Sequence, residues 1–333
     1  MKHKNIAFFI PHLGCPHCCS FCDQRAISGN ASAPSPESVR KTLEEAFAAI
    51  EDRENCEIAF FGGSFTAIPK EQMLSYLKIA QPFCGEGGFG GIRVSTRPDA
   101  VDEEILLLLK EHGVTVIELG AQSMRDEVLI KNGRGHTAKD VRDAARRVKA
   151  KGFSLGLQMM VGLPGDTNPG DSLFTAEELI ALKPDFVRIY PAVILPHTQM
   201  AKWFQSGEYI PMELDTAVSV CAELLLRFEA AKIPVIRLGL HDSPDVAQNH
   251  IGGIYHPAFR ELCESKIWLD RMTALLADQQ KGSYTFFVPV SCVSKAVGQH
   301  RTNIKKLREA GYTARVCGDP TLRFDEIKLK GGV

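Results

Sequence analysis

Four cysteines lie within eight residues near the start of the chain, at positions 15, 18, 19 and 22. Cys15, Cys19 and Cys22 have the spacing C-x-x-x-C-x-x-C, on a loop that follows a short apolar run. Three thiolates that bind one [4Fe–4S] cube leave its fourth iron without a protein ligand. The spacing therefore predicts an iron–sulfur centre with one iron open to a small molecule, and it leaves Cys18 as a bystander thiol.

Two other chemistries are open to these thiols. Parsed as two C-x-x-C pairs, the four cysteines form a zinc motif, but structural zinc sites normally separate their pairs by about a dozen residues or more. A single C-x-x-C at the start of a helix would be a redox dithiol. Because the two pairs abut here, the pattern favours the iron–sulfur centre.

Composition sets the broad class of the protein. The chain has 333 residues, of which 44% are hydrophobic, and Lys+Arg 39 against Asp+Glu 40 give a net charge of -1. Such a charge exerts no overall attraction on nucleic acid, so an RNA site must be a local patch. Ten cysteines are too sparse for a disulfide scaffold. The short N-terminal apolar run, interrupted by Pro11, is neither a signal nor an anchor. These features predict a cytoplasmic protein with no membrane partner.

Short apolar runs alternate with longer amphipathic stretches over the first two-thirds of the chain. The runs predict strands at 6–10, 57–62, 92–96, 114–119, 154–161 and 186–190. The stretches predict helices at 37–50, 70–83, 102–112, 138–151, 171–182 and 197–206. Six β-then-α units imply a parallel sheet. We therefore predict an α/β fold, a partial TIM-type (β/α)6 barrel, as a core domain over residues 1–210.

The pattern changes over residues 211–333. A long helix at 213–231, a strand at 234–240 and a helix at 258–278 are followed by a strand at 285–289, a basic helix at 303–310 and a β-rich tail. We predict a smaller α+β C-terminal region.

Glycine and polar residues cluster where the predicted barrel strands end. Barrel enzymes place their active sites at this end of their strands. In chain order the motifs are Phe-Phe-Gly-Gly-Ser-Phe-Thr (60–66), Ser-Thr-Arg-Pro-Asp (95–99), Ile-Glu-Leu-Gly-Ala-Gln-Ser (117–123), Arg-Gly-His-Thr (134–137), Met-Met-Val-Gly-Leu-Pro-Gly (159–165) and Arg-Ile-Tyr-Pro (188–191).

With the cysteine loop, these motifs make the chain resemble the radical S-adenosylmethionine superfamily, and within it the radical domain of the elongator catalytic subunit, the acetyltransferase of the tRNA wobble uridine. The resemblance runs from about residue 6 to residue 212. The elongator subunit spaces its first two cysteines more widely, and no acetyl-CoA loop is visible in the remaining residues here. The resemblance therefore implies the radical chemistry without the acetyl transfer.

The resemblance implies two cofactors, a [4Fe–4S] cluster and S-adenosylmethionine bound at the open iron. An electron from a flavodoxin- or ferredoxin-type donor would break the sulfonium bond and release a 5′-deoxyadenosyl radical for hydrogen abstraction. Transfer RNA, or another RNA, is the candidate substrate partner. A small molecule is the alternative, as in the coproporphyrinogen dehydrogenases, although Gln24 stands where those enzymes usually carry a fourth cysteine. A zinc-stabilised RNA-binding module is the third hypothesis.

The cofactor-binding residues that the resemblance implies are Phe21, Gly62, Gly63, Ser95, Arg97, Gln122, Ser123, Arg134, Met160 and Val161. The two glycines would let backbone carbonyls approach the methionyl ammonium. Arg134 would pair with the methionyl carboxylate, and Met160 and Val161 would flank adenine or belong to the core. Arg97 could bind a carboxylate or phosphate, or mark a plain loop.

Other side chains stay open in function. His136 and Tyr190 are possible donors or simple structural hydrogen-bonding groups. Two basic groups could contact phosphate or be solvated helix faces; they comprise Arg142, Arg146, Arg147, Lys149 and Lys151, and then Lys295, His300, Arg301, Lys305, Lys306 and Arg308. No catalytic residue and no oligomeric state follow from the sequence.

Overall fold

The computed structural model describes residues 4–11, 13–15, 19–24, 32–166, 168–240 and 244–331. It forms two compact units. The first consists of Met1–Glu213 with Arg227–Tyr255, and the second of Leu214–Leu226 with His256–Val333. Within the described residues, no helix combines the length and apolarity that a membrane span requires.

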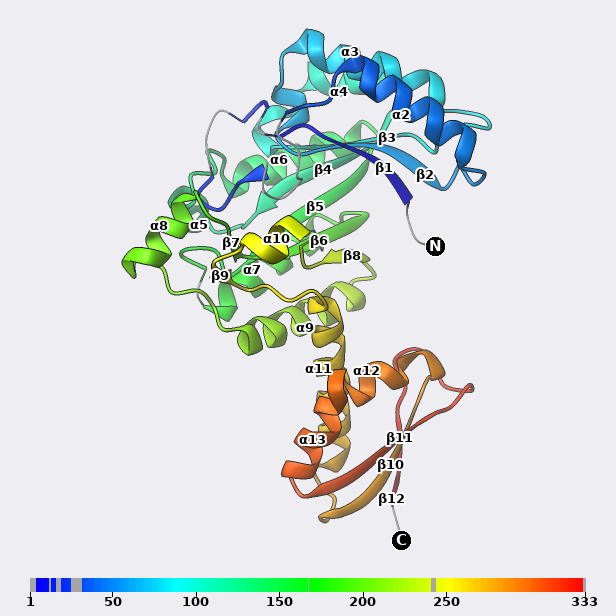
Figure 1. The fold of residues 1–333 in the computed structure, drawn as a ribbon, viewed down its shortest axis with the longest axis vertical. Helices are drawn as coiled ribbons and strands as arrows, with labels where there is room; N and C mark the ends of the chain where they lie inside the picture. The colour runs from blue at the N-terminus through cyan, green and yellow to red at the C-terminus, as the bar shows by residue number, and fades with distance from the viewer. Residues whose placement is uncertain are drawn as a thin grey trace. The chain divides into compact units, whose positions relative to one another are not determined.

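A curled parallel sheet of seven strands forms the first unit (Figure 1). Its strands are β1 (Lys4–Phe9), β2 (Cys56–Phe61), β3 (Ile92–Thr96), β4 (Val114–Gln122), β5 (Ser154–Val161), β6 (Phe186–Pro191) and β8 (Val235–Leu238). They stand in chain order across the sheet, β1-β2-β3-β4-β5-β6-β8. Parallel neighbours in chain order require a return connection after each strand. The predicted α/β fold of the partial TIM type is confirmed.

Helices supply these connections. They are α2 (Pro36–Ala49), α3 (Lys70–Ala80), α4 (Glu103–Glu111), α5 (Asp126–Lys131), α6 (Ala138–Ala150), α7 (Pro169–Ala181), α8 (Gln199–Ser206) and α9 (Leu214–Ala230). A further helix, α10 (Pro244–Asn249), follows β8. Local chemistry sets several starts: the Asp102 carboxylate accepts the Ile105 N–H ahead of α4, and Thr137 and Asp140 form a reciprocal capping box on α6. The helices predicted from Pro, Gly and apolar periodicity match to within a few residues.

One strand lies elsewhere than expected. The run at 234–240 was predicted in the C-terminal region, but β8 pairs in parallel with β6 and becomes the seventh strand of the barrel sheet. The sheet therefore continues past the predicted six units. Two very short strands that the sequence did not indicate, β7 (Val193–Ile194) and β9 (Gly252–Gly253), pair antiparallel beside it.

Side chains on the two faces of the barrel sheet differ sharply. One alternating set is apolar and buried, and it includes Val94, Ile117 and Leu157. Amphipathic helices need such a face to pack against, so the other set lines the concave side. That other set contains Glu57, Arg93, Glu118, Gln158 and Arg188, which are joined by ion pairs and hydrogen bonds.

Glu118 is the centre of this inner network. Its carboxylate is fully buried and accepts from Arg93 Nη1 at 2.7 Å, from Arg188 Nη2 at 3.0 Å and from Gln158 Nε2 at 2.9 Å. The Arg93 guanidinium also donates from Nε to Glu57 at 2.8 Å. A buried charge is tolerated only when it is paired and hydrogen-bonded. The network meets that condition with charges drawn from four strands.

The cysteine loop docks on the turn that ends β2 by direct backbone contact. Gly14 has φ +71°, and a Cβ there would lie 2.3 Å from the Ser64 carbonyl oxygen. Gly63 has φ +53°, and its Cβ would lie 2.2 Å from the Leu13 carbonyl oxygen. The Ser64 N–H donates to that same Leu13 oxygen at 2.9 Å. Only glycine fits both positions, because it alone combines left-handed backbone with this approach.

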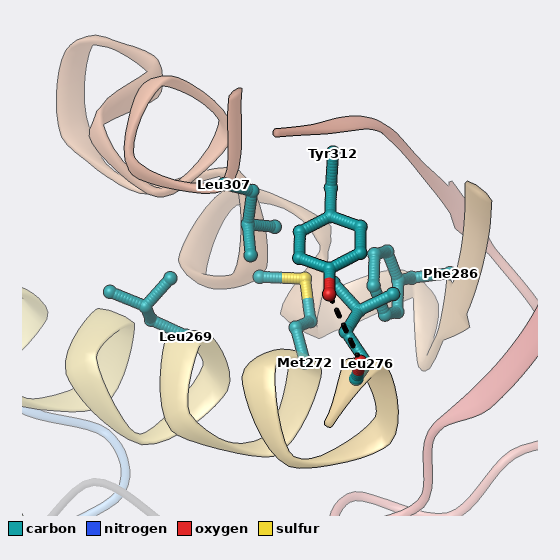
Figure 2. Close-up of a cluster of buried hydrophobic side chains, with 6 residues drawn as sticks. All are labelled: Leu269, Met272, Leu276, Phe286, Leu307 and Tyr312. Carbon is teal, nitrogen blue, oxygen red and sulfur yellow. Dashed lines mark hydrogen bonds between the residues drawn. The ribbon is translucent and has the colours of Figure 1, made fainter. Parts of the chain in front are cut away.

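The second unit is built around a smaller sheet of order β11-β10-β12. Its elements are α11 (Phe259–Leu276), β10 (Gly282–Val288), α12 (Val293–Val297), α13 (Thr302–Glu309), β11 (Tyr312–Gly318) and β12 (Lys328–Gly331). Figure 2 shows its core, in which Met272 and Leu276 of α11 meet Phe286 and Tyr312 of the sheet. The Tyr312 hydroxyl donates to the Leu276 carbonyl at 3.2 Å. The core occupies one face of the sheet.

Replacing Glu118 by Ala should lower the free energy of unfolding by about 3–5 kcal/mol, because two buried guanidinium groups lose their shared carboxylate. Denaturant unfolding under anaerobic conditions measures this. Glu104→Ala is the control: its exposed pair with Lys70 Nζ, at 2.7 Å, should matter little. Equal losses in the two variants would contradict the central role of Glu118.

Replacing Gly63 by Ala should undock the cysteine loop, since the added carbon meets backbone and cannot be relieved by a side-chain rotation. We expect iron bound per chain after anaerobic reconstitution to fall severalfold while far-UV circular dichroism is retained. Gly87→Ala is a matched control, because Gly87 also has positive φ, +71°, but its Cβ would meet nothing within 4 Å. Full iron binding by the Gly63 variant would refute the docking argument.

Candidate functional site

The three predicted cysteine ligands share one environment after β1. Cys19 is buried, and Cys15 and Cys22 are partly exposed. The Cys22 N–H donates to the Cys19 carbonyl at 3.1 Å, which holds the C-x-x-C segment in a turn. Burial, and after it the negative charges of Cys19 and Cys15, raise the pKa of Cys22 to about 12, while Arg134 opposes them. Cys18, the expected bystander, lies outside the described residues.

Mutual repulsion of three soft thiolates suits a cationic metal centre. A cluster takes each thiolate on a separate iron, whereas a single ion draws its ligands to one point. Among the residues that the structure describes, no group of three His, Cys, Asp or Glu side chains converges as a single ion requires. The thiolate donor set itself fits iron–sulfur chemistry.

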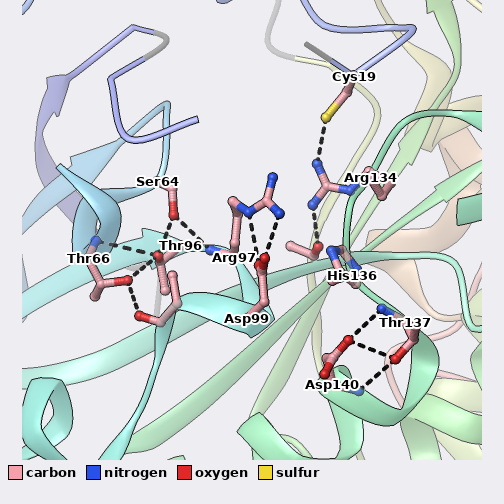
Figure 3. A network of polar contacts seen from close by, with 12 residues as sticks. Cys19, Ser64, Thr66, Thr96, Arg97, Asp99, Arg134, His136, Thr137 and Asp140 are labelled. Carbon is pink, nitrogen blue, oxygen red and sulfur yellow. Dashed lines mark hydrogen bonds and ion pairs between the residues drawn. The ribbon is translucent and has the colours of Figure 1, made fainter. Parts of the chain in front are cut away.

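Arg134 joins the cysteine loop to the barrel sheet (Figure 3). Its Nη1 donates to Cys19 Sγ at 3.0 Å, and its Nη2 donates to the Gly120 carbonyl of β4 at 2.7 Å. The third donor, Nε, is buried and has no hydrogen-bond partner within the described part of the chain. A buried guanidinium donor without a partner fits an anionic group of a bound molecule.

Gln122 lies beside Arg134 at the end of β4. The pairing of β4 with β5 shifts register between Gly120 and Gln122, and Gln122 adopts φ +67°. Its side-chain Oε1 is buried without a partner among the described residues. Two neighbouring side chains therefore offer a donor and an acceptor that the protein leaves unmatched. This is the observation that fits a polar cofactor at this place.

Ser123 has structural partners instead. Its Oγ accepts the Arg125 N–H at 3.1 Å and lies 3.4 Å from Thr175 Oγ1. Ser95 Oγ, at the end of β3, lies 3.4 Å from Gln158 Nε2 of the inner network. Their predicted contact with the cofactor stays a prediction.

Arg97 already holds a carboxylate. Its Nε and Nη2 donate to the two oxygens of Asp99 at 2.9 and 2.6 Å (Figure 3), and its backbone N–H donates to Ser64 Oγ. Burial lowers the pKa of Arg97, but Asp99 and the thiols of Cys19 and Cys15 together raise it above the ordinary value. The expected anion-binding guanidinium is thus engaged within its own loop, close to the cysteines.

Phe21 and the predicted adenine-side residues, Met160 and Val161, lie in apolar surroundings. Phe21 packs beside two clusters of buried side chains, one around Ile194 and one around Leu163, and Met160 packs on the second of these. Val161 is fully buried. The Arg134 guanidinium carbon lies 6.0 Å from the centre of the Phe21 ring. The structure brings Phe21, Met160 and Arg134 into one region.

Gly62 and Gly63 directly follow β2 and both have positive φ. Their predicted approach to the methionyl ammonium stays a prediction. The Gly63 N–H donates to Gln24 Oε1 at 2.6 Å. The glutamine that replaces the fourth cysteine of the coproporphyrinogen dehydrogenases therefore ties the cysteine loop to the glycine turn. Gln24, which the sequence marked only as a difference from the coproporphyrinogen dehydrogenases, thus has a structural role.

His136 and Tyr190 have structural partners. Burial, with the charge of Arg134, lowers the pKa of His136 to about 4, and its Nε2 lies 3.2 Å from the Ala121 carbonyl oxygen. Tyr190 lies in β6 and hydrogen-bonds to Arg188, while burial raises its pKa. His136 is therefore neutral at ordinary pH and supplies no charge to the site.

Sequence reasoning missed two buried polar residues here. Asn132 accepts from Ser20 Oγ at 2.5 Å and donates to the Pro164 carbonyl at 2.8 Å, which clamps the cysteine loop to the loop after β5. Asp166 accepts from the Gly162 N–H and from Ser172 Oγ, and burial raises its pKa to about 6. Asn132 lies just before the Arg-Gly-His-Thr motif and Asp166 just after the motif at 159–165, but nothing in the sequence pattern marks either residue as buried.

Known proteins share this arrangement. The family model of the radical SAM superfamily matches residues 9–170, and the model described as the Radical_SAM C-terminal domain matches residues 184–268. The uncharacterized protein MJ0486 of Methanocaldococcus jannaschii is 29% identical over 67% of this chain and 73% of that protein. The tRNA uridine(34) acetyltransferase of the same organism is 32% identical over 38% of this chain, but this covers only 24% of that enzyme.

A solved structure agrees with the fold. The archaeal Elp3 of Methanocaldococcus infernus, with its N-terminus deleted, superposes with a TM-score of 0.61 at 20% identity, covering 81% of this chain and 63% of that one. Members of the matched family bind a [4Fe–4S] cluster and S-adenosylmethionine. With its cysteine loop, barrel sheet and matched models, this chain belongs to the radical S-adenosylmethionine (radical SAM) superfamily of enzymes.

Proposed function

We propose that this enzyme modifies tRNA, abstracting hydrogen from a nucleotide with the 5′-deoxyadenosyl radical. The polar concave face of the barrel carries this proposal. Glu118 and Arg93 are buried there and Arg188 is partly buried, and the three make this lining polar in a fixed, hydrogen-bonded arrangement. Such a face suits a nucleotide, which is polar around its whole edge, better than a porphyrin ring. The similarity to the tRNA uridine(34) acetyltransferases over the radical core supports the same substrate class.

Cys15, Cys19 and Cys22 are the proposed cluster ligands. When bound, the cluster supplies the electron that breaks the sulfonium bond of S-adenosylmethionine. Arg134 holds Cys19 with one arm and offers its free Nε to the methionyl carboxylate. Gln122 offers its unmatched Oε1 to a hydroxyl or amine of the same cofactor. Phe21, Met160 and Val161 exclude water on the adenine side.

Acetyl transfer is outside the proposal, since this chain spans about a quarter of the acetyltransferase it matches. A flavodoxin- or ferredoxin-type protein is the proposed reductant, and the cytoplasm the proposed location. Both follow from the need of such a cluster for a low-potential electron and a reducing compartment.

The substrate class is tested by cofactor cleavage. Anaerobically reconstituted enzyme with dithionite should release 5′-deoxyadenosine faster when fractionated cellular tRNA is added, and coproporphyrinogen should have no effect. Stimulation by the porphyrin alone would replace tRNA with a small-molecule substrate. A preparation that contains zinc and no iron would instead indicate a zinc-stabilised RNA-binding module.

The ligand assignment is tested by two neighbouring substitutions. Cys19→Ala should abolish cluster assembly, because a cube held by two thiolates loses its third anchor, while Cys18→Ala should leave iron content near four per chain. Iron analysis and the visible absorption of the cluster measure both. Equal iron loss in the two variants would mean that a different set of three cysteines binds the cluster.

A further inference from the structure

The second unit has a sheet with one covered and one open face. Phe286 and Val288 of β10 point to the helices, as do Tyr312 of β11 and Leu329 of β12, where they join the buried clusters around α11 and α12. Side chains alternate across a strand, so the residues between these point to the other side. The open face of this sheet, hereafter the open face, comprises Ser283, Thr285, Phe287, Thr313, Arg315, Cys317, Lys328 and Lys330.

Charge on the open face has one sign. Arg315, Lys328 and Lys330 are exposed, and the strand positions of this face include no acid. The strand register places Arg315 and Lys330 opposite Thr285, one on each side of the middle strand. With neighbouring strands about 4.8 Å apart, these two cations stand roughly 10 Å from each other. Lys328 lies opposite Phe287. Asp319 follows β11 directly, and its pKa is lowered mainly by hydrogen bonds from Thr321 and also by the charge of Lys328.

An aromatic side chain stands among these cations. Phe287 is partly exposed in the middle strand, between its cross-strand neighbours Cys317 and Lys328. Arg315 and Lys330 flank Thr285, which lies two residues before Phe287 on the same face. Aromatic rings interleaved with basic side chains are how proteins hold single-stranded nucleic acid: bases stack on the ring and phosphates meet the cations.

The basic side chains on and directly after helix α6, in contrast, have partners within the protein. Arg142 pairs with Glu178, Arg146 with Asp143 and Lys151 with Glu103. Arg147 and Lys149 donate to backbone carbonyls of neighbouring loops. Helix α13 carries the exposed residues Lys305 and Lys306 on the helical side of the second unit, with no aromatic side chain interleaved in the helix. The open face therefore combines the features that these two helices lack.

We infer that the open face of the β11-β10-β12 sheet binds the RNA substrate, with phosphates at Arg315 and Lys330 and an unstacked base on Phe287. The inference rests on the proposed action on tRNA and names the surface that holds it. A local basic patch is what a chain of net charge -1 needs in order to bind a polyanion.

The test uses the full-length reconstituted holoenzyme and fluorescently labelled tRNA, with binding followed by anisotropy over a series of salt concentrations. The double variant Arg315→Glu with Lys330→Glu should weaken binding roughly tenfold at about 0.15 M salt and reduce the slope of log K against log salt by about two. Phe287→Leu, which keeps an apolar side chain in the sheet, should weaken binding about fivefold or more through lost stacking.

The matched control is Lys305→Glu with Lys306→Glu, which makes the same change of charge on the helical side of this unit. It should bind tRNA like the parent. An unchanged affinity in the open-face variant, or an equal loss in the control, overturns the inference. Cofactor cleavage without RNA, which should be equal in all variants, confirms that each one is folded and loaded.

Failure of this inference is distinguishable from failure of the proposed function. If tRNA stimulates cofactor cleavage by the parent while the open-face variants bind it normally, the substrate stands and the surface is wrong. If the parent neither binds tRNA nor responds to it, both proposals fall.

Discussion

The candidate site depends on the contact between two backbone segments, residues 13–14 of the cysteine loop and residues 62–64 after β2. A carbonyl of each segment occupies the space that a Cβ of the other would need. No side chain mediates this contact, so the loop is held at a distance that only the peptide backbone sets. Because Cys15 and Cys19 belong to the cysteine loop, this backbone contact helps to fix the positions of their thiols. Gln24 and Asn132 then fasten the rest of the loop to the turn and to the segment after β5.

Arg134 is the second element on which the site is organised. It reaches from the segment after α5 to a thiol on one side and to the backbone of β4 on the other. A guanidinium can do this because its donor nitrogens diverge in one plane and reach separated partners, whereas an ammonium donates from a single nitrogen. Its remaining donor, Nε, and the Oε1 of Gln122 are both buried without a partner among the described residues. The protein therefore leaves one buried donor and one buried acceptor unmatched here, as the proposed cofactor site requires.

Short-range chemistry was the part of the structure that the sequence predicted well. Cysteine spacing, Pro and Gly at helix ends and the glycine pair after β2 all act within a few residues, so the strands and helices of the barrel were predictable. Partners across the sheet were not. In the sequence, Glu118 is a single acid in an apolar strand, and its partners Arg93 and Arg188 lie 25 and 70 positions away. Which of them meet depends on strand register. β8 was misplaced for the same reason, because four residues after a long helix carry no mark of the sheet they join. The ion pair of Arg97 with Asp99, two residues later, was also not predictable, because it depends on the direction of the backbone between them.

Gln122 has a backbone conformation that is unfavourable for a residue with a side chain. An L-residue with a long side chain in left-handed backbone is disfavoured by about 1 kcal/mol or more, and a glycine would adopt the same φ of +67° without that penalty. Stability alone would thus select the smallest residue at this position. The chain instead carries an amide there, held by an irregular pairing of β4 with β5 that redirects it. The proposed contact of Gln122 with the cofactor would account for this strain, since strained backbone is often found where proteins bind ligands.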